Sequence, residues 1–350
     1  MIKATAQPNK KTRIAINGFG RIGRAALKIA LSKPEAEVVA INDLSDPEAL
    51  AYYLKHDSAY KNTELDISIL HESDRNYMVI GSSKVAMFAE ADPKNLPWKN
   101  LNVDVVLECT GFFTKDGSAS AHLDAGATKV VISAPAKGGN IQTFLLGVND
   151  KQYLGQNIVS NASCTTNCIS PIVSIINKEM GIVKSIMTTV HAVTSTQNIV
   201  DSMPKKGSSD LRKGRAGFTN MIPTTTGAAI ATTEVLPELK GLFDGVSIRV
   251  PVITGSLADI TMLVRKKTTV EEINSVLEKA ASTEGLKGVL KVTHEQLVSS
   301  DIIGDPHSAI VDASMTKVVD GDLVKVLAWY DNEWGYSNRL VELALTIAQV

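Results

Sequence analysis

Apolar runs and helical patterns alternate along the first part of the chain. Four apolar runs, at residues 13–17, 37–41, 103–111 and 129–134, are separated by segments that include helical spacing. Runs that are apolar on both faces are typical of strands in a buried parallel sheet. Residues 65–85 instead alternate polar and apolar positions, which predicts an inserted hairpin. The pattern predicts an α/β domain with a doubly wound sheet.

The pattern changes after about residue 164. Longer alternating runs follow, at residues 184–191, 245–250, 259–264 and 322–329. Such alternation predicts a mostly antiparallel sheet with helices on one face, so we expect a second domain of the α+β class. Residues 337–350 have the pattern of an amphipathic helix. A chain of 350 residues also exceeds one ordinary hydrophobic core, which agrees with two domains.

A glycine-rich turn follows the first predicted strand. Residues 18–23 read G-F-G-R-I-G and open a helical pattern, which is the setting that a dinucleotide-binding turn requires. Asp43 ends the second predicted strand, about 20 residues further on, where a carboxylate binds a ribose 2′-OH and repels the 2′-phosphate of NADP. Thr110, Gly111 and Ser133 also lie at carboxyl ends of predicted strands. The turn therefore predicts NAD binding, and a glycine turn without a ligand is the alternative.

Cys164 lies where a predicted strand leads into a predicted helix, within the sequence S-N-A-S-C-T-T-N-C. The first N–H groups of a helix and its dipole lower the pKa of a cysteine, so we expect a thiolate at this position. The strand that follows ends in His191, and a cysteine within reach of a histidine suits a thiolate–imidazolium pair. The alternative is a buried structural cysteine, which is how we interpret Cys109 and Cys168.

Charge and cysteine content narrow the classes of function. Lys and Arg total 36 against 37 for Asp and Glu, and this net charge of −1 argues against nucleic acid or an anionic membrane as the main partner. The three cysteines have no zinc-binding spacing, so we expect no metal site and a reducing compartment. The sequence has no signal-peptide pattern and no apolar run that could cross a membrane. We expect a cytoplasmic protein whose first ten or so residues are loosely ordered.

An irregular stretch covers residues 197–221. It contains a proline, several glycines and five basic residues. A long irregular segment inside a compact domain usually has a function or packs against another subunit. The alternative is a solvated basic loop.

Four sequence blocks carry a resemblance to a known family. They are N-G-F-G-R-I-G from Asn17, S-N-A-S-C-T-T-N-C around Cys164, H-A-V-T-S-T-Q from His191 and W-Y-D-N-E-W-G-Y-S-N-R from Trp329. From about Arg13 to its end, the chain closely resembles the phosphorylating glyceraldehyde-3-phosphate dehydrogenases. The resemblance implies an NAD-binding Rossmann domain at residues 12–163, completed by the helix at 337–350, and a catalytic domain at 164–332.

The resemblance also implies a reaction. Cys164 would attack the aldehyde of glyceraldehyde 3-phosphate, and His191 would act as the base. NAD would take up the hydride, and inorganic phosphate would convert the thioester to 1,3-bisphosphoglycerate, a step of glycolysis and gluconeogenesis. A homotetramer is implied as well, with residues 197–221 at a subunit interface.

Further residues are assigned to binding by the same resemblance. The expected cofactor-binding residues are Asn17, Gly18, Gly20, Arg21, Ile22, Gly23, Asp43, Thr110, Gly111, Ser133, Asn332 and Tyr336. The expected site for the C3 phosphate of the substrate is Thr194 and Arg249, and that for the attacking phosphate is Ser163, Thr165, Thr226 and Gly227. Hydroxyls, backbone N–H groups and a guanidinium suit phosphate because they supply several donors without a metal.

The chain departs from the family pattern in places. Ala91 stands where many members carry an arginine on the adenosine side of the cofactor, Ile230 stands where lysine is common, and the loop near 203–212 is longer. Two other functions stay open as alternatives. Erythrose-4-phosphate dehydrogenase shares the cysteine block, but Thr194 and the run T-T-T-G-A-A resemble the anion sites of the phosphorylating enzyme. An RNA- or protein-binding role would be secondary, because the near-zero net charge does not favour nucleic acid.

Overall fold

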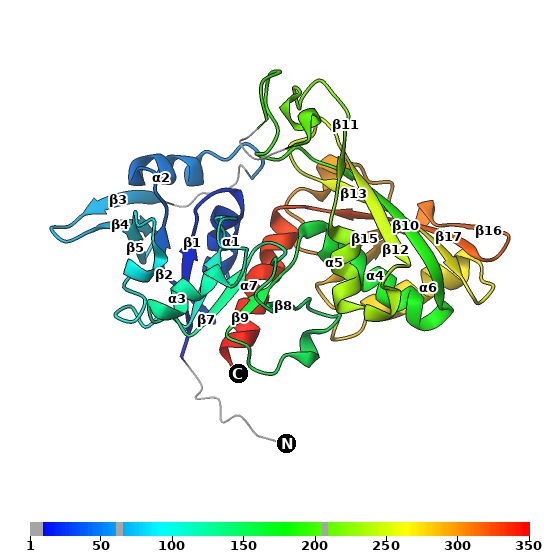
Figure 1. Cartoon of the computed structure of the whole chain (residues 1–350), viewed down its shortest axis with the longest axis horizontal. Coiled ribbons are helices and arrows are strands. Elements are labelled where there is room, and N and C mark those ends of the chain that lie inside the picture. The colour runs from blue at the N-terminus through cyan, green and yellow to red at the C-terminus, as the bar shows by residue number, and fades with distance from the viewer. Residues whose placement is uncertain (1–9, 61–65, 205–208) are drawn as a thin grey trace. The chain divides into compact units, whose positions relative to one another are not determined.

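The computed structural model describes residues 10–60, 66–204 and 209–350, and these residues form two compact units (Figure 1). The first unit takes in the described residues up to Phe144 together with Asp150–Ala162 and Ser337–Val350. The second comprises Leu145–Asn149 and Ser163–Tyr336. Two expectations concern residues outside the described ranges, namely the loosely ordered start of the chain and the part of the basic loop at 205–208.

The first unit is built on one sheet, which has nine strands within the described residues. In sheet order they are β3 Ile67–His71, β4 Asn76–Ile80, β5 Ser83–Phe88, β2 Ala36–Asn42, β1 Thr12–Asn17, β6 Val105–Glu108, β7 Lys129–Ile132, β9 Ile158–Ser160 and β8 Gln142–Thr143. The strands from β5 to β8 pair in parallel, and β3 and β4 add an antiparallel edge. The parallel sheet and the inserted hairpin are both confirmed.

The register of this sheet brings three polar residues together at one edge. Asn17 at the end of β1 is paired with Asn42 of β2 on one side and with Glu108 of β6 on the other. All three side chains are buried. The carboxyl ends of parallel strands at such an edge are where doubly wound sheets bind their ligands.

In the described part of the first unit, four helices lie wholly or mainly within it, and they are α1 Arg21–Leu31, α2 Pro47–Lys55, α3 Ala121–Asp124 and α7 Trp334–Ala348. Between β6 and β7, where a parallel sheet requires a crossover, the chain forms only the 3₁₀ turn Ser118–Ser120 followed by the single turn of α3. Gly117 and Gly126 bracket this segment in the left-handed region, at φ of 75° and 100°, which keeps the helix short. Within the unit, Glu342 of α7 forms an ion pair with Lys33, 3.0 Å away.

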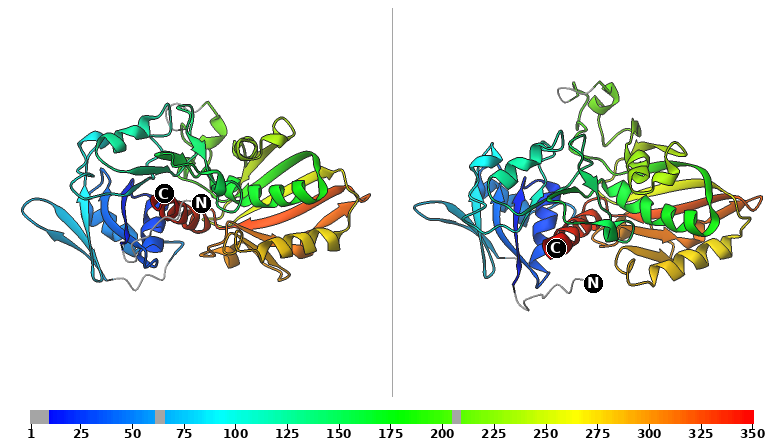
Figure 2. Two further views of the ribbon diagram at one scale, coloured as in Figure 1. Left: turned by 90° about the horizontal axis from the view of Figure 1, so that it is seen from below. Right: turned by 60° about the horizontal axis from the view of Figure 1, so that its bottom comes forward.

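The second unit has a mixed sheet. In sheet order its strands are β11 Ile222–Thr225, β12 Phe243–Arg249, β10 Ile182–His191, β13 Ser256–Val264, β17 Leu323–Tyr330, β15 Ala309–Asp312 and β14 Leu290–Thr293, and β16 Lys317–Val319 pairs with β17. The long strands β10, β13 and β17 lie side by side, as Figure 2 shows in green, yellow and orange. Among the described strands of this second sheet, only β10 with β12 and β14 with β15 pair in parallel, so the prediction of a mostly antiparallel sheet is confirmed.

Three helices pack together in the second unit. They are α4 Cys164–Met180, α5 Ala228–Val235 and α6 Val270–Ala281, and α4 contacts both other helices as well as β13, β15 and β17. Strand β13 alternates buried and half-buried side chains along its whole length, as expected when helices cover one face of a sheet. A helix starting at Cys164 was predicted and is confirmed. In the described part of the loop at 197–221, the only helical piece is the 3₁₀ turn Leu211–Gly214.

Candidate active site

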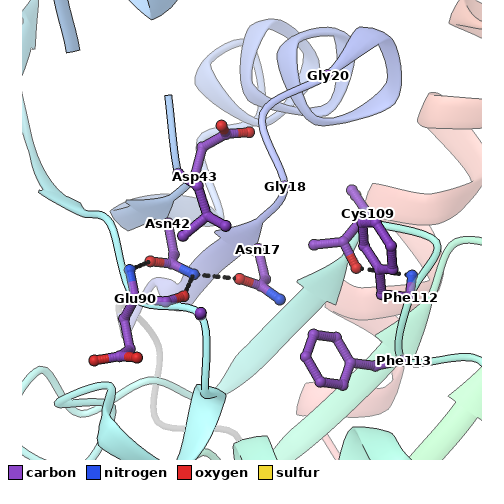
Figure 3. A pocket seen from close by; sticks show the side chains of 12 residues that line it. Asn17, Gly18, Gly20, Asn42, Asp43, Glu90, Cys109, Phe112 and Phe113 are labelled. Atoms are coloured by element: carbon purple, nitrogen blue, oxygen red, sulfur yellow. Dashed lines mark hydrogen bonds between the residues drawn. The ribbon is translucent and has the colours of Figure 1, made fainter. Parts of the chain in front are cut away.

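A pocket of about 610 Å³ opens in the first unit where β1, β2 and β6 end (Figure 3). Its lining residues are Asn17, Gly18, Gly20, Asn42, Asp43, Leu44, Glu90, Ala91, Cys109, Thr110, Phe112 and Phe113. The volume is that of an ordinary small-molecule site, and the position is the one that the strand order of a doubly wound sheet favours.

The three glycines of the turn at 18–23 have different surroundings. Gly18 has a φ of 91°, and a Cβ there would lie 2.7 Å from the backbone nitrogen of Thr110. A Cβ on Gly23 would collide with the carbonyl oxygen of Gly18, so these two glycines allow close packing. A Cβ on Gly20 would meet nothing within 4 Å, which leaves the backbone at the start of α1 open to a pyrophosphate. The turn therefore fits a dinucleotide.

Asp43 lines this pocket, and its carboxylate also accepts hydrogen bonds from the backbone of two turns. Its Oδ2 accepts the backbone N–H of Phe19 at 2.7 Å, and its Oδ1 accepts that of Ser45 at 3.0 Å. A carboxylate oxygen has a second lone pair, so each oxygen can still accept a ribose hydroxyl. The residue thus couples the glycine turn to the segment after β2.

The other predicted cofactor-binding residues of the first unit form two groups, those that line the pocket and those that do not. Asn17 and Thr110 line the pocket, whereas Arg21, Ile22, Gly23, Gly111 and Ser133 do not. Arg21 turns toward Asp57, with Nη1 and Oδ2 2.5 Å apart, and stacks over Tyr60. Ser133 forms a hydrogen bond with Cys109. The binding roles of these side chains stay predictions.

Cys164 and His191 come together in the second unit. Cys164 is the first residue of α4, and the hydroxyl of Ser163 caps that helix by accepting the backbone N–H of Thr166 at 3.1 Å. His191 is the last residue of β10, and its Nε2 lies 3.5 Å from Sγ of Cys164. The thiol and the imidazole are therefore within hydrogen-bonding distance, as a nucleophile and its base require.

Arg249 lies beside this pair because of sheet register. Strands β10 and β12 pair in parallel with His191 opposite Arg249. Nδ1 of His191 lies 2.7 Å from the carbonyl oxygen of Ala192. Nη1 of Arg249 donates to the same carbonyl oxygen at 3.1 Å and also contacts Nδ1 of His191. The carbonyl oxygen of Ala192 accepts from a protonated Nδ1, whereas Nη1 of Arg249 donates only to an unprotonated one, so these two contacts do not fix the tautomer. A base at Nε2 requires the tautomer with the proton on Nδ1. In that tautomer Nε2 offers a lone pair to the thiol proton.

The electrostatics of the pair bear on the expected thiolate. Burial raises the pKa of the Cys164 thiol above its usual value, although the charge of Arg249 and the N–H groups at the helix start lower it in part. Burial and Arg249 together lower the pKa of His191 to about 3. These two shifts favour a thiol and a neutral imidazole over the expected thiolate–imidazolium pair, because desolvation opposes the effect of the helix start.

The pH dependence of Cys164 reactivity follows from these shifts. A thiolate is the reactive form, and a raised pKa means that its fraction grows with each unit of pH through the neutral range, while His191 stays neutral above about pH 3. The rate of alkylation by iodoacetamide, assigned to Cys164 by mass spectrometry, should rise steadily from pH 6 to 9. A rate already at its maximum at pH 6 would contradict this prediction.

The residues predicted to bind phosphate have varied surroundings. Thr165 is buried and its hydroxyl lies 2.9 Å from that of Tyr330. Thr226 accepts the backbone N–H of Ala228 at 3.2 Å, and Gly227 precedes α5 with open space around it. Thr194 is half-buried, with its hydroxyl 2.8 Å from that of Thr196. Their roles in phosphate binding stay predictions.

Tyr330 is a residue of this site that the sequence did not single out. Its hydroxyl lies 2.9 Å from that of Thr165 and 2.7 Å from that of Thr189, and its ring meets His191 edge-on with centroids 6.0 Å apart. It thereby ties the first turn of α4 to the strand that carries the base. In the sequence, the only indication of a role for Tyr330 is its place in the block W-Y-D-N-E-W-G, from which Asn332 was assigned to the site.

The second unit also fixes Asn332. Its Oδ1 accepts the hydroxyl of Ser256 at 2.9 Å and lies 3.3 Å from that of Thr254, and both Asn332 and Tyr336 are buried. An amide oxygen held in this way leaves the NH₂ group with a defined direction.

Among the described residues, no group of three or more His, Cys, Asp or Glu could hold a metal ion, and no helix is both long and apolar enough to cross a bilayer.

A dinucleotide pocket and a cysteine–histidine pair define a class, the nicotinamide-dependent dehydrogenases that use a cysteine nucleophile. Residues 12–116 match the family model described as glyceraldehyde 3-phosphate dehydrogenase, NAD binding domain, and residues 163–332 match its C-terminal domain. The chain belongs to the glyceraldehyde-3-phosphate dehydrogenase family.

Curated relatives agree with this assignment. Glyceraldehyde-3-phosphate dehydrogenase of Zymomonas mobilis is 51% identical over 340 residues, and that of Mycolicibacterium smegmatis is 50% identical over 345. The enzyme of Mycobacterium tuberculosis is 49% identical over 344 residues. Each comparison covers 96% of this chain and 98% of the relative, so the similarity extends over both units.

Proposed function

We propose that this protein oxidises glyceraldehyde 3-phosphate with NAD and inorganic phosphate to give 1,3-bisphosphoglycerate. The observation that carries the proposal is the cysteine–histidine pair, with Sγ and Nε2 3.5 Å apart at the start of α4. Family membership supports the substrate, and the open glycine turn supports the cofactor.

The first half of the reaction uses Cys164 and His191. Sγ of Cys164 forms a bond to the aldehyde carbon while His191 Nε2 takes the thiol proton and passes it to the carbonyl oxygen, which becomes the hydroxyl of a thiohemiacetal. Bound NAD supplies the acceptor for the hydride. His191 removes the hydroxyl proton, so that the carbon becomes a thioester carbonyl. The N–H groups at the start of α4 stabilise negative charge on that oxygen.

The second half regenerates the enzyme. A phosphate oxygen attacks the thioester carbon, the C–S bond breaks, and the thiolate of Cys164 takes a proton back from His191. We assign the substrate phosphate to Thr194 and Arg249, and the attacking phosphate to Ser163, Thr165, Thr226 and Gly227. Arg249 supports this assignment because its guanidinium lies against His191.

We further propose that the chain works as a cytoplasmic homotetramer. Ile186 of β10 and Val246 of β12 are exposed, and the register of the two strands places both on the sheet face opposite buried Met187. Such an uncovered apolar face suits contact with a second copy. Sedimentation of the purified protein tests the tetramer, and a monomer at micromolar concentration would contradict it.

The test of the function is NADH formation by purified protein. Glyceraldehyde 3-phosphate should be oxidised quickly only when phosphate is present, because the thioester otherwise turns over by slow hydrolysis. Erythrose 4-phosphate is the matched alternative substrate. If erythrose 4-phosphate were preferred and its oxidation did not need phosphate, the proposal would fail in favour of erythrose-4-phosphate dehydrogenase.

Asp43→Ala should weaken NAD binding about tenfold and reduce the preference for NAD over NADP. The substitution removes the ribose acceptor and also releases the N–H groups of Phe19 and Ser45. Titration calorimetry with both cofactors measures the two affinities, and Asp46→Ala, on the exposed cap of α2, is the control. Unchanged selectivity would move the discrimination to another segment, such as the loop near Met203.

A further inference from the structure

A chain of buried hydrogen bonds runs behind the pocket of the first unit. Trp98, His122 and Glu108 are each at most 1% exposed. Trp98 Nε1 donates to His122 Nδ1 at 3.0 Å, and His122 Nε2 lies 3.0 Å from Glu108 Oε2. Glu108 then contacts two residues of the pocket lining, accepting from Asn17 Nδ2 at 2.6 Å and from the backbone N–H of Thr110 at 2.8 Å.

The hydrogen bonds in this chain have a fixed direction. An indole N–H can only donate, so His122 accepts at Nδ1, carries its proton at Nε2 and donates to Glu108. The amide of Asn17 and the backbone N–H of Thr110 are donors too, and the Thr110 hydroxyl contacts the same carboxylate. Glu108 is thus the acceptor for all of these partners. An amide in its place would turn an NH₂ group toward donors.

The acceptor position matters because of what its partners do. Thr110 begins the turn after β6, and its hydroxyl accepts the backbone N–H of Phe112 at 3.0 Å. Asn17 ends β1, and its Oδ1 accepts from Asn42 Nδ2 at 2.7 Å. All four residues, Asn17, Asn42, Thr110 and Phe112, line the pocket. One buried carboxylate therefore holds two separate parts of the pocket wall.

We propose that Glu108 is a positioning residue for NAD binding and that Trp98, acting through His122, sets the direction of the hydrogen bonds that it receives. Glu108 does not line the pocket, so it acts through Asn17 and Thr110 rather than on the cofactor. The inference rests on NAD binding by the proposed function.

Titration calorimetry of NAD with the full chain tests the proposal. Glu108→Gln should weaken NAD binding about 10- to 100-fold, because its NH₂ group faces donors of His122 and Asn17. The value of kcat at saturating NAD should stay within about threefold of the wild type, since the chemistry lies with other residues.

A double variant tests the direction of the bonds. In the combined variant Glu108→Gln/Trp98→Phe the indole N–H is gone, so His122 can move its proton to Nδ1 and accept at Nε2 from the new amide. This variant should bind NAD at least about threefold more tightly than Glu108→Gln alone, whereas a role in packing alone gives losses that add. Trp329→Phe, a matched change in the second unit, should leave NAD affinity unchanged.

Three results would overturn the proposal. They are wild-type NAD affinity in Glu108→Gln, a double variant that binds no more tightly than Glu108→Gln, and, if Glu108→Gln does not fold, wild-type affinity in Trp98→Phe. In that last case a loss of about 3- to 10-fold in Trp98→Phe supports the proposal. A wild-type chain that fails to bind NAD would instead overturn the proposed function, and this inference with it.

Discussion

Cys164→Ser should abolish phosphate-dependent NADH formation, with a loss on the order of 10⁴-fold or more. The serine oxygen keeps the position at the start of α4, but an alcohol is a far weaker acid than a thiol, and the neutral imidazole of His191 cannot deprotonate it effectively. No thiohemiacetal forms, so the carbon that must give up hydride stays an aldehyde. The rate is measured with saturating glyceraldehyde 3-phosphate, NAD and phosphate.

The same variant should bind NAD almost as tightly as the wild type. All the residues that line the dinucleotide pocket belong to the first unit, whereas Cys164 belongs to the second. Titration calorimetry therefore separates loss of chemistry from loss of folding. Cys168→Ser is a matched control, because Cys168 is buried on the same helix and its sulfur lies 4.0 Å from the carbonyl oxygen of Ala328. Substantial turnover by Cys164→Ser would exclude it as the nucleophile.

Local pattern was enough to predict the parts of the site that are built within a few residues. A strand, a glycine turn and a helix follow one another at 12–31, and Asp43 comes directly after the strand that follows this helix. The helix that begins at Cys164 could be predicted in the same way, from the small capping residues before it and the helical spacing after it.

The pairing of strands that are far apart in the sequence could not be predicted from the local pattern of residues. Arg249 lies against His191 because β10 and β12 pair in parallel, and no local signal specifies which strands become neighbours. Tyr330 meets Thr165 and Thr189 for the same reason, since three separate elements converge on its hydroxyl. Glu108 looked simply like the polar end of an apolar strand, and its partners His122 and Trp98 come from distant segments.

The shift in the pKa of Cys164 was hidden from the sequence for a related reason. The helix start was visible in the sequence, and it does act in the expected direction. Burial was not visible, because it depends on side chains from three separate strands, namely His191, Arg249 and Tyr330, that surround the site. Desolvation disfavours any charged group and is the larger effect at this site. A base is therefore needed at neutral pH.

His191→Asn should lower the rate of NADH formation about 10²- to 10⁴-fold at neutral pH. Asparagine keeps a polar side chain at the end of β10 but cannot accept a proton. Because burial keeps the pKa of Cys164 above its usual value, few thiolates form without a base. The deficit should shrink as the pH rises, since hydroxide then generates the thiolate that His191 supplies in the wild type.

This pH dependence separates a lost base from a damaged site. A variant whose site was only distorted would form NADH slowly at every pH. The rate of His191→Asn should instead approach that of the wild type between pH 8 and 10. His294→Asn is the matched control, because that histidine is exposed and bonds to Glu278 on the surface. A wild-type rate in His191→Asn at pH 7 would refute the pairing of Cys164 with His191. A deficit that is the same at all pH values would instead mean that His191 acts by orienting the substrate and not by taking its proton.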